Sequence, residues 1–292
     1  MELRERLARE GIRLSRRYGQ HLVVDRGLLQ RMVDYAEVSG RDTVLEVGAG
    51  TGGLTLLLAR RAGEVIAVER DPRLVSLLRR ALEEEGCGNV RILRGDVLRL
   101  PLPPFNKVVS NLPYSISSDL TFRLLEEDFE VAVLMYQLEF ARRLVARPGS
   151  EEYGRLTVST FRRAEVEILE EVPPSSFFPR PKVRSAVVRL RPRKTPPFRV
   201  EDEERFQRVL RVLFHHPRQK VRNALYHSFT ELFPRANLDK RGRREVLEAH
   251  VPGELAEARA KELPPEELAR LSDLLGGLER ELHRPPQKVQ QG

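Results

Sequence analysis

The chain has 292 residues, of which 51 are basic and 43 acidic, and its net charge is +8. This length fits one large domain or two ordinary ones, and a composition of 40% hydrophobic and 32% charged residues excludes a disordered or collagen-like protein. One cysteine excludes a disulfide framework, the longest apolar runs fall short of the ~18 residues of a membrane span, and the charged N-terminus lacks a signal-peptide core, so we expect a cytoplasmic protein.

The first two-thirds of the chain alternates strand-like with helix-like segments. Short apolar runs predict five strands, at residues 43–47, 64–68, 90–93, 107–110 and 131–136. Helical patterns lie between them, at residues 54–61 and 72–85. Two further β-rich stretches follow, at 156–169 and 185–190. This alternation predicts an α/β fold with a mostly parallel, Rossmann-like sheet of about seven strands.

The pattern changes after residue 190. Residues 191–197 contain three prolines and are typical of a linker. Only helical patterns follow, at 206–214, 221–229, 241–249 and 266–275. We therefore expect a first domain at residues 1–194 and a small all-helical domain at 195–292.

The net charge is concentrated in one part of the chain. Residues 178–230 hold 14 basic and 4 acidic side chains, whereas the segments before and after them each carry a net charge of −1. A concentrated positive charge indicates a polyanionic partner, most simply a nucleic acid. The basic residues proposed to contact RNA in or beside this segment are Arg180, Lys182, Arg184, Arg218, Lys220 and Arg222.

A glycine-rich turn, Glu46-Val-Gly48-Ala-Gly50-Thr-Gly52-Gly53, directly follows the first expected strand. Glycines let the backbone turn sharply and approach a ligand closely. Glu69 ends the second strand and Asp96 the third. A carboxylate at Glu69 can accept hydrogen bonds from ribose hydroxyls, and one at Asp96 can accept a bond from an adenine amino group. The pattern predicts a cofactor that contains adenosine, and both NAD and S-adenosylmethionine fit it.

The fourth strand end favours S-adenosylmethionine. It reads Ser110-Asn111-Leu-Pro-Tyr114, which resembles the signature of methyltransferases that act on exocyclic amino groups. An adenine amino nitrogen is a poor nucleophile, because its lone pair is delocalised into the ring. The Asn111 oxygen and a backbone carbonyl at Leu112 or Pro113 can accept its two N–H bonds, and Tyr114 can stack on an extruded base. Because the methyl donor is already activated, positioning suffices and no metal is needed.

The chain as a whole resembles the KsgA family, the small-subunit rRNA adenine dimethyltransferases, and most closely its archaeal and eukaryotic branch. Besides the positions above, the matching stretches are Tyr18-Gly-Gln-His-Leu-Val-Val-Asp25, Tyr153-Gly-Arg-Leu156, Val172-Pro-Pro-Ser175, Phe177-Phe-Pro-Arg-Pro-Lys-Val183 and Arg218-Gln-Lys-Val-Arg-Asn-Ala-Leu225. His21 stands where asparagine is commoner in the family, and Val23 where leucine is commoner.

The resemblance implies a class I methyltransferase sheet followed by a small helical domain that recognises rRNA. It implies N6-dimethylation of two adjacent adenosines in the 3′-terminal hairpin of small-subunit rRNA, coupled to ribosome biogenesis, by a monomer acting on a pre-30S-type particle. By match, the cofactor contacts would be His21, Val23, Gly48, Gly50, Glu69, Asp96 and Asn111. Phe177 would close over the target base opposite Tyr114.

Three alternative functions use the same features. A ribosome-assembly or RNA-binding factor with dispensable catalysis would need the same basic segment. A large-subunit rRNA adenine methyltransferase shares the catalytic signature, although the Arg218 stretch argues against it. A nicotinamide oxidoreductase fits only the first three strand ends.

Overall fold

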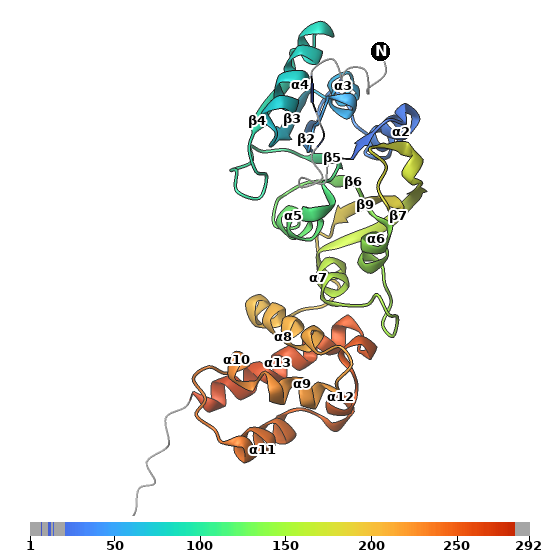
Figure 1. Ribbon diagram of the computed structural model, residues 1–292. Coiled ribbons are helices and arrows are strands. Elements are labelled where there is room, and N and C mark those ends of the chain that lie inside the picture. Colours follow the sequence, from blue (N-terminus) through green and yellow to red (C-terminus); the bar gives the residue numbers. More distant parts are fainter. Residues whose placement is uncertain (1–6, 8–10, 13, 15–20, 284–292) are drawn as a thin grey trace, which may run out of the picture. The chain divides into compact units, whose positions relative to one another are not determined.

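The computed structural model describes residues 7, 11, 12, 14 and 21–283 (Figure 1). Their contacts divide the chain into two compact units. The first runs to Val145 and resumes from Arg163 to Arg193, and the second comprises Ala146–Arg162 and the chain from Lys194 onward. In the described part of the chain, no helix is long and apolar enough to cross a membrane.

The first unit is built on a seven-stranded sheet, which confirms the predicted fold class. Its strands are β2 (Thr43–Val47), β3 (Glu64–Glu69), β4 (Val90–Arg94), β5 (Lys107–Asn111), β6 (Val131–Gln137), β7 (Ala164–Val172) and β9 (Ser185–Pro192). They lie in the order β4-β3-β2-β5-β6-β9-β7; the first five are parallel, and β9 is antiparallel to both its neighbours. The strand order reverses beside β2, so the carboxyl ends of β2 and β5 flank a crevice.

Helices bury the sheet because both faces of its parallel strands are apolar. These helices are α2 (Arg26–Tyr35), α3 (Gly53–Ala59), α4 (Pro72–Glu84), α5 (Ser117–Leu124) and α6 (Leu138–Leu144). Buried leucines of α2 and α3 share one core with alternate residues of β2, β3, β5 and β6, whereas α4 packs in other clusters. Asp71 caps α4 by accepting from the Arg73 amide at 3.0 Å, and Pro72 occupies the first turn as its restricted φ predicts.

A short antiparallel ribbon closes one end of this unit. β1 (Leu22–Val23) pairs with β8 (Phe177–Phe178), and the register sets Leu22 opposite Phe178 and Val23 opposite Phe177. The ribbon brings the segment after residue 20 beside a stretch more than 150 positions away in the chain.

One predicted element is wrong in its first half. The sequence pattern predicts β structure over 156–169, but residues Arg155–Arg163 form helix α7 and only Ala164 onward forms β7. The β-branched residues of this stretch favour a strand locally. In the folded chain one face of the helix is buried, and Val158 packs among the helices of the second unit. Packing therefore overrides intrinsic propensity here.

In the described residues of the second unit the regular elements are helices, with one isolated β-bridge between Lys220 and Arg259. Besides α7 it contains α8 (Glu203–His215), α9 (Val221–His227), α10 (Phe229–Leu232), α11 (Lys240–His250), α12 (Gly253–Glu257) and α13 (Pro265–Leu282). They share one apolar core centred on Phe206 and Phe229. The sequence suggests a division at residue 194 alone, whereas contacts also group residues 146–162 with these helices. Tyr153 shows why, because its buried hydroxyl donates to the Leu263 carbonyl at 3.0 Å.

Candidate functional site

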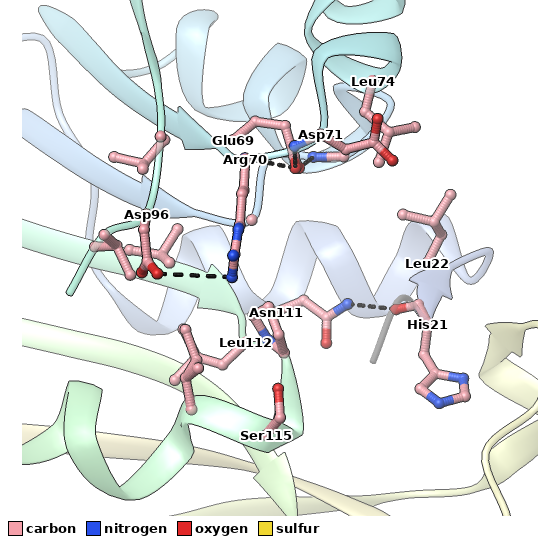
Figure 2. Close-up of a pocket in the computed structure, with 18 residues that line it drawn as sticks. His21, Leu22, Glu69, Arg70, Asp71, Leu74, Asp96, Asn111, Leu112 and Ser115 are labelled. Carbon is pink, nitrogen blue, oxygen red and sulfur yellow. Dashed lines mark hydrogen bonds and ion pairs between the residues drawn. The ribbon is translucent and has the colours of Figure 1, made fainter. Parts of the chain in front are cut away.

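A pocket opens at the carboxyl ends of β2, β3 and β5 (Figure 2). The predicted residues that line it are His21, Gly48, Gly50, Glu69, Asp96, Asn111, Leu112 and Pro113. These residues come from stretches up to 90 positions apart. Parallel strands bring them together because their carboxyl ends share one edge of the sheet.

The glycine-rich turn fits closely against two other segments of the site. The start of the turn is fixed to β3 by the Gly48 amide, which donates to the Val68 carbonyl at 2.8 Å. Gly48 and Gly50 have φ values of 77° and 60°, which favour glycine. A Cβ at Gly50 would lie 2.8 Å from Leu22 Cδ2, and one at Gly48 would lie 3.3 Å from Pro113 Cδ. The turn therefore lies close to Leu22 and Pro113, and a side chain at either glycine would crowd them.

Backbone amides hold the Glu69 carboxylate. Its Oε2 accepts from the Gly50 amide at 2.9 Å, and its Oε1 accepts from the Arg70 and Asp71 amides at 2.7 and 2.8 Å. Burial raises the pKa of Glu69, and these three amides oppose the rise. Because Oε2 has a single partner here, it keeps acceptor capacity for a ligand hydroxyl.

Asp96 lies across the pocket from Glu69 (Figure 2), and its carboxylate forms an ion pair with Arg70, the residue that follows Glu69. Its Oδ1 accepts from the Leu98 amide at 3.1 Å, and its Oδ2 is 3.6 Å from Nη1 of Arg70. Figure 2 shows the Arg70 side chain extending from the end of β3 to this carboxylate. Arg123 in α5 donates to the carbonyls of Val97 and Leu100 and so ties down the loop that follows Asp96.

The Asn111 amide has a defined orientation. Its Nδ2 donates to the His21 carbonyl at 2.8 Å. Because a carbonyl can only accept, this contact identifies the amide nitrogen, and Figure 2 shows Oδ1 turned away from His21. The Pro113 carbonyl accepts from the Ile116 amide at 3.1 Å, whereas no donor to the Leu112 carbonyl is found among the described residues. The two backbone acceptors that the sequence left open therefore differ in their present partners, and each keeps acceptor capacity.

Tyr114 adjoins the pocket without lining it. Its hydroxyl is 2.6 Å from Ser185 Oγ, and its ring stacks on that of His21 with centroids 5.8 Å apart and planes 24° apart. The His21 ring in turn hydrogen-bonds the Pro179 carbonyl through Nδ1 at 2.7 Å. Burial raises the pKa of Tyr114, and the bond to Ser185 opposes that rise.

Besides Tyr114, two residues of the predicted site, Val23 and Phe177, do not line the pocket. Phe177 is 2% exposed and belongs, with Val23, to the core beneath α2 and α3. The reason is the ribbon register, since side chains alternate along a strand and opposed residues share a face. Leu22 and Phe178 therefore take the other face, and Leu22 lines the pocket.

Other pocket residues were not singled out as ligands from the sequence. They are Val47, Val68, Arg70, Asp71, Leu74, Gly95, Val97, Ser115 and Ile116, in addition to Leu22. Several are the immediate neighbours of Glu69, Asp96 and Asn111. Their position beside predicted ligands was the one available signal. Among the described residues there is no cluster of three or more metal-ligating side chains.

The predicted RNA-binding residues differ in their ion pairs. Arg180, Lys182 and Arg218 are exposed. Arg184 pairs with Glu171 at 3.2 Å, while Lys220 and Arg222 both pair with Glu257. The positive charge that is concentrated in residues 178–230 is therefore partly neutralised by acids from other parts of the chain.

Comparison with known proteins gives consistent results. The family model described as ribosomal RNA adenine dimethylase matches residues 11–256. The chain is 47% identical to a probable ribosomal RNA small subunit methyltransferase A of Methanothermobacter thermautotrophicus, over 93% of this chain and 94% of that one. It is 48% identical to the protein of the same description from Methanopyrus kandleri, over 90% and 92%.

Solved structures show the same relationship. A dimethyladenosine transferase from Plasmodium falciparum superimposes with a TM-score of 0.72 at 30% identity, over 89% of this chain and 98% of that one. The 23S rRNA methyltransferase ErmE superimposes with a TM-score of 0.62 at 33% identity, over 87% and 99%.

Proposed function

The chain belongs to the ribosomal RNA adenine dimethylase family, and we propose that it methylates adenine N6 in small-subunit rRNA with S-adenosylmethionine as the methyl donor. The observation that carries the proposal is the orientation of Asn111. Its Oδ1 is directed away from His21, beside the strand ends that would hold an adenosine cofactor (Figure 2). A hydrogen-bond acceptor there is what an exocyclic amino group requires.

The pocket residues fit S-adenosylmethionine. Glu69 Oε2 has acceptor capacity for a ribose hydroxyl, and Asp96 can accept from the adenine amino group. The glycine-rich turn lets the cofactor approach the backbone, since a Cβ at Gly50 would already meet Leu22. Apolar Val97 and Ile116 offer contacts for the adenine ring. When bound, this cofactor supplies an electrophilic methyl group on a sulfonium.

The chain's own task is to orient the acceptor nitrogen. Asn111 Oδ1 and the Leu112 carbonyl would accept the two N–H bonds of the adenine amino group, and so direct its lone pair toward the methyl group. The Pro113 carbonyl is the alternative acceptor, since its bond from the Ile116 amide leaves one of its two lone pairs available. Tyr114 would stack on the extruded base. After the first transfer one N–H remains on the amino group. A neutral acceptor such as Asn111 suits both the unmethylated and the monomethylated adenine.

The finer features of the reaction belong to the same proposal. We infer two adjacent target adenosines in the 3′-terminal hairpin, a pre-30S-type particle as partner, and action as a cytoplasmic monomer. The family resemblance of the motifs supports each of these. The helical unit and the basic residues around Arg180 and Arg218 would recognise the rRNA backbone, for which arginine is well suited.

The decisive assay combines the protein, labelled S-adenosylmethionine and small ribosomal subunits that lack the modification. Dimethyladenosine at two adjacent positions is expected. Intact cofactor binding without any dimethyladenosine would contradict the proposal. Ribosomes from cells that carry only an Asn111→Ala enzyme test the assembly-factor alternative, which requires normal subunits.

The likeness to ErmE gives a second candidate a specific basis, because that protein is a 23S rRNA methyltransferase. The same assay with large-subunit rRNA separates the two. Methylation that maps only to large-subunit rRNA would replace the proposed substrate.

A further inference from the structure

His21 makes three contacts, with Pro179, Tyr114 and Asn111. The first uses its ring. Nδ1 is 2.7 Å from the Pro179 carbonyl, and because that oxygen can only accept, Nδ1 carries the proton. The ring is therefore held to the segment that follows β8, and its rotation is restricted.

The second contact is with the ring of Tyr114. The two rings stack with centroids 5.8 Å apart and an interplanar angle of 24°. The far end of Tyr114 is fixed separately, because its hydroxyl bonds Ser185 Oγ at 2.6 Å. Tyr114 is thus held at its edge by β9 and against one face by His21. An aromatic ring that must receive a base needs this kind of support.

The third contact uses the main chain of His21. Its carbonyl accepts from Asn111 Nδ2 at 2.8 Å and so orients Oδ1 for the target amino group. This contact does not depend on the side chain. Substitution of His21 therefore tests the ring while leaving the carbonyl that orients Asn111 in place.

We propose that His21 is a positioning residue for the target adenine, and that its side chain acts through Tyr114 rather than through the cofactor. The inference rests on the proposed function and departs from the family resemblance, which implies a cofactor contact at this position. Asparagine, the commoner residue there, has no ring to stack on Tyr114. The histidine of this chain therefore adds a support for the base-binding ring that the usual residue does not provide.

The first test compares His21→Ala, His21→Phe and the wild type. Calorimetry gives the Kd of S-adenosylmethionine, and transfer to small subunits that lack the modification gives kcat and KM. For His21→Ala we expect a Kd within about twofold of the wild type and a kcat reduced on the order of 10²-fold, since small displacements of reacting groups cost that much. We also expect monomethyladenosine to accumulate, because the second transfer needs the same placement. His21→Phe restores stacking and should recover part of kcat.

A double-mutant cycle separates this role from general destabilisation. If His21 acts through Tyr114, then His21→Ala adds little to the loss caused by Tyr114→Ala. His250→Ala, which removes a histidine ring that bonds Val246 and Glu281 in the second unit, is the control and should leave kcat unchanged.

The possible failures are distinguishable. No transfer by the wild-type protein would refute the proposed function. If the wild type transfers methyl groups normally, a second result would overturn this inference. In that result His21→Ala binds the cofactor at least tenfold more weakly with an unchanged kcat, which would assign His21 to the cofactor. Additive losses in the double-mutant cycle would overturn it as well.

Discussion

At the scale of single residues, burial raises the pKa of two neighbouring carboxyl groups, but backbone amides oppose the rise at only one of them. Glu69 accepts three backbone amides, which favour its charged form. Glu46 is 2% exposed, and among the described residues its Oε2 has no hydrogen-bond partner. Burial raises the pKa of Glu46 to about 8, and the nearby charge of Glu69 adds to the rise. Glu46 therefore holds a proton at neutral pH, whereas three backbone amides at Glu69 oppose the effect of burial on its pKa.

The protonated state of Glu46 predicts a pH-dependent stability. Its folded pKa lies above the ordinary value of 4.5, so the folded state binds the proton more tightly and stability falls as the pH rises from 4.5 to 8. The slope is at most about 1.4 kcal/mol per pH unit. Glu46→Gln lacks this slope, so its stability relative to the wild type should increase between pH 5 and pH 8.5. Denaturant unfolding at several pH values measures this, with exposed Glu165→Gln as the control. Parallel curves for wild type and Glu46→Gln would contradict the prediction.

The proposed function makes Asn111 more important for the transfer step than for holding the adenosine. Asn111→Ala removes the amino-group acceptor but leaves Glu69 and Asp96 in place, so we expect transfer to fall at least on the order of 10²-fold. S-adenosylmethionine binding should stay measurable by calorimetry. Single-turnover transfer of labelled methyl groups measures the first quantity. Full turnover by the variant would place the acceptor elsewhere.

At the scale of elements, the two-residue ribbon of β1 and β8 decides which side chains face the pocket. A strand alternates its side chains between two faces, so a shift of one residue moves a side chain from pocket to core. Family matching predicted Val23 and Phe177; the register directs both toward the core beneath α2 and α3 and presents Leu22 and Phe178 on the other face. Of these four residues, Leu22 lines the pocket.

The contact between this ribbon and the glycine-rich turn predicts the effect of Gly50→Ala. The new Cβ would meet Leu22 Cδ2 at 2.8 Å on a backbone with φ of 60°. We expect cofactor affinity to fall about tenfold, since strain in this region costs on the order of 1–2 kcal/mol. The double variant Gly50→Ala/Leu22→Ala should recover part of the affinity, because it relieves the collision but not the strained φ.

Gly86→Ala is a matched control for this measurement. Its φ is 66°, and nothing lies within 4 Å of the added Cβ. It therefore imposes similar backbone strain away from the pocket and should leave the cofactor Kd unchanged. Equal weakening by both glycine variants would mean that the collision with Leu22 plays no part.

At the scale of the whole molecule, folding redistributes the charge that is concentrated in residues 178–230. Arginines in β9 and directly after it pair with acids outside that segment: Arg189 with Glu167, Arg191 with Glu37 and Arg193 with Glu165. In the second unit, Glu257 pairs with two of the predicted RNA-binding residues. The local excess of positive charge in the sequence therefore overstates the charge available to a polyanion. Arg180, Lys182 and Arg218, for which no ion pair is found within the described residues, become the first candidates.

The pairing of Glu257 with Lys220 and Arg222 predicts an unusual gain of affinity. The same two cations lower the pKa of Glu257, so it is charged at neutral pH and competes with phosphates for both. Glu257→Gln should tighten RNA binding and steepen its salt dependence if these residues contact RNA. Neutralising Arg218, Lys220 and Arg222 together should weaken binding and flatten the salt slope. Filter binding across a salt series measures both effects.

Glu254→Gln is the matched control, because Glu254 lies in the same helix α12 and pairs with Arg270 instead. It should change RNA affinity less than Glu257→Gln does. If the wild type, Glu257→Gln and Glu254→Gln share one salt slope, the basic residues of this region do not bind the RNA backbone.

Local patterns in the amino-acid sequence were sufficient to predict the parallel strands, the order of motifs and several residues that line the pocket, because strand ends, glycine turns and carboxylates are local signals with local causes. That Glu69, Asp96 and Asn111 lie at one pocket follows from the sequence without coordinates, since parallel strands must bring their carboxyl ends to one edge. Tertiary contacts were needed to establish the face that Val23 and Phe177 present, the helical state of α7, and the partners of the arginines. Each of these depends on a contact between residues distant in the chain or on a register between short strands, and neither is encoded in any single stretch of sequence.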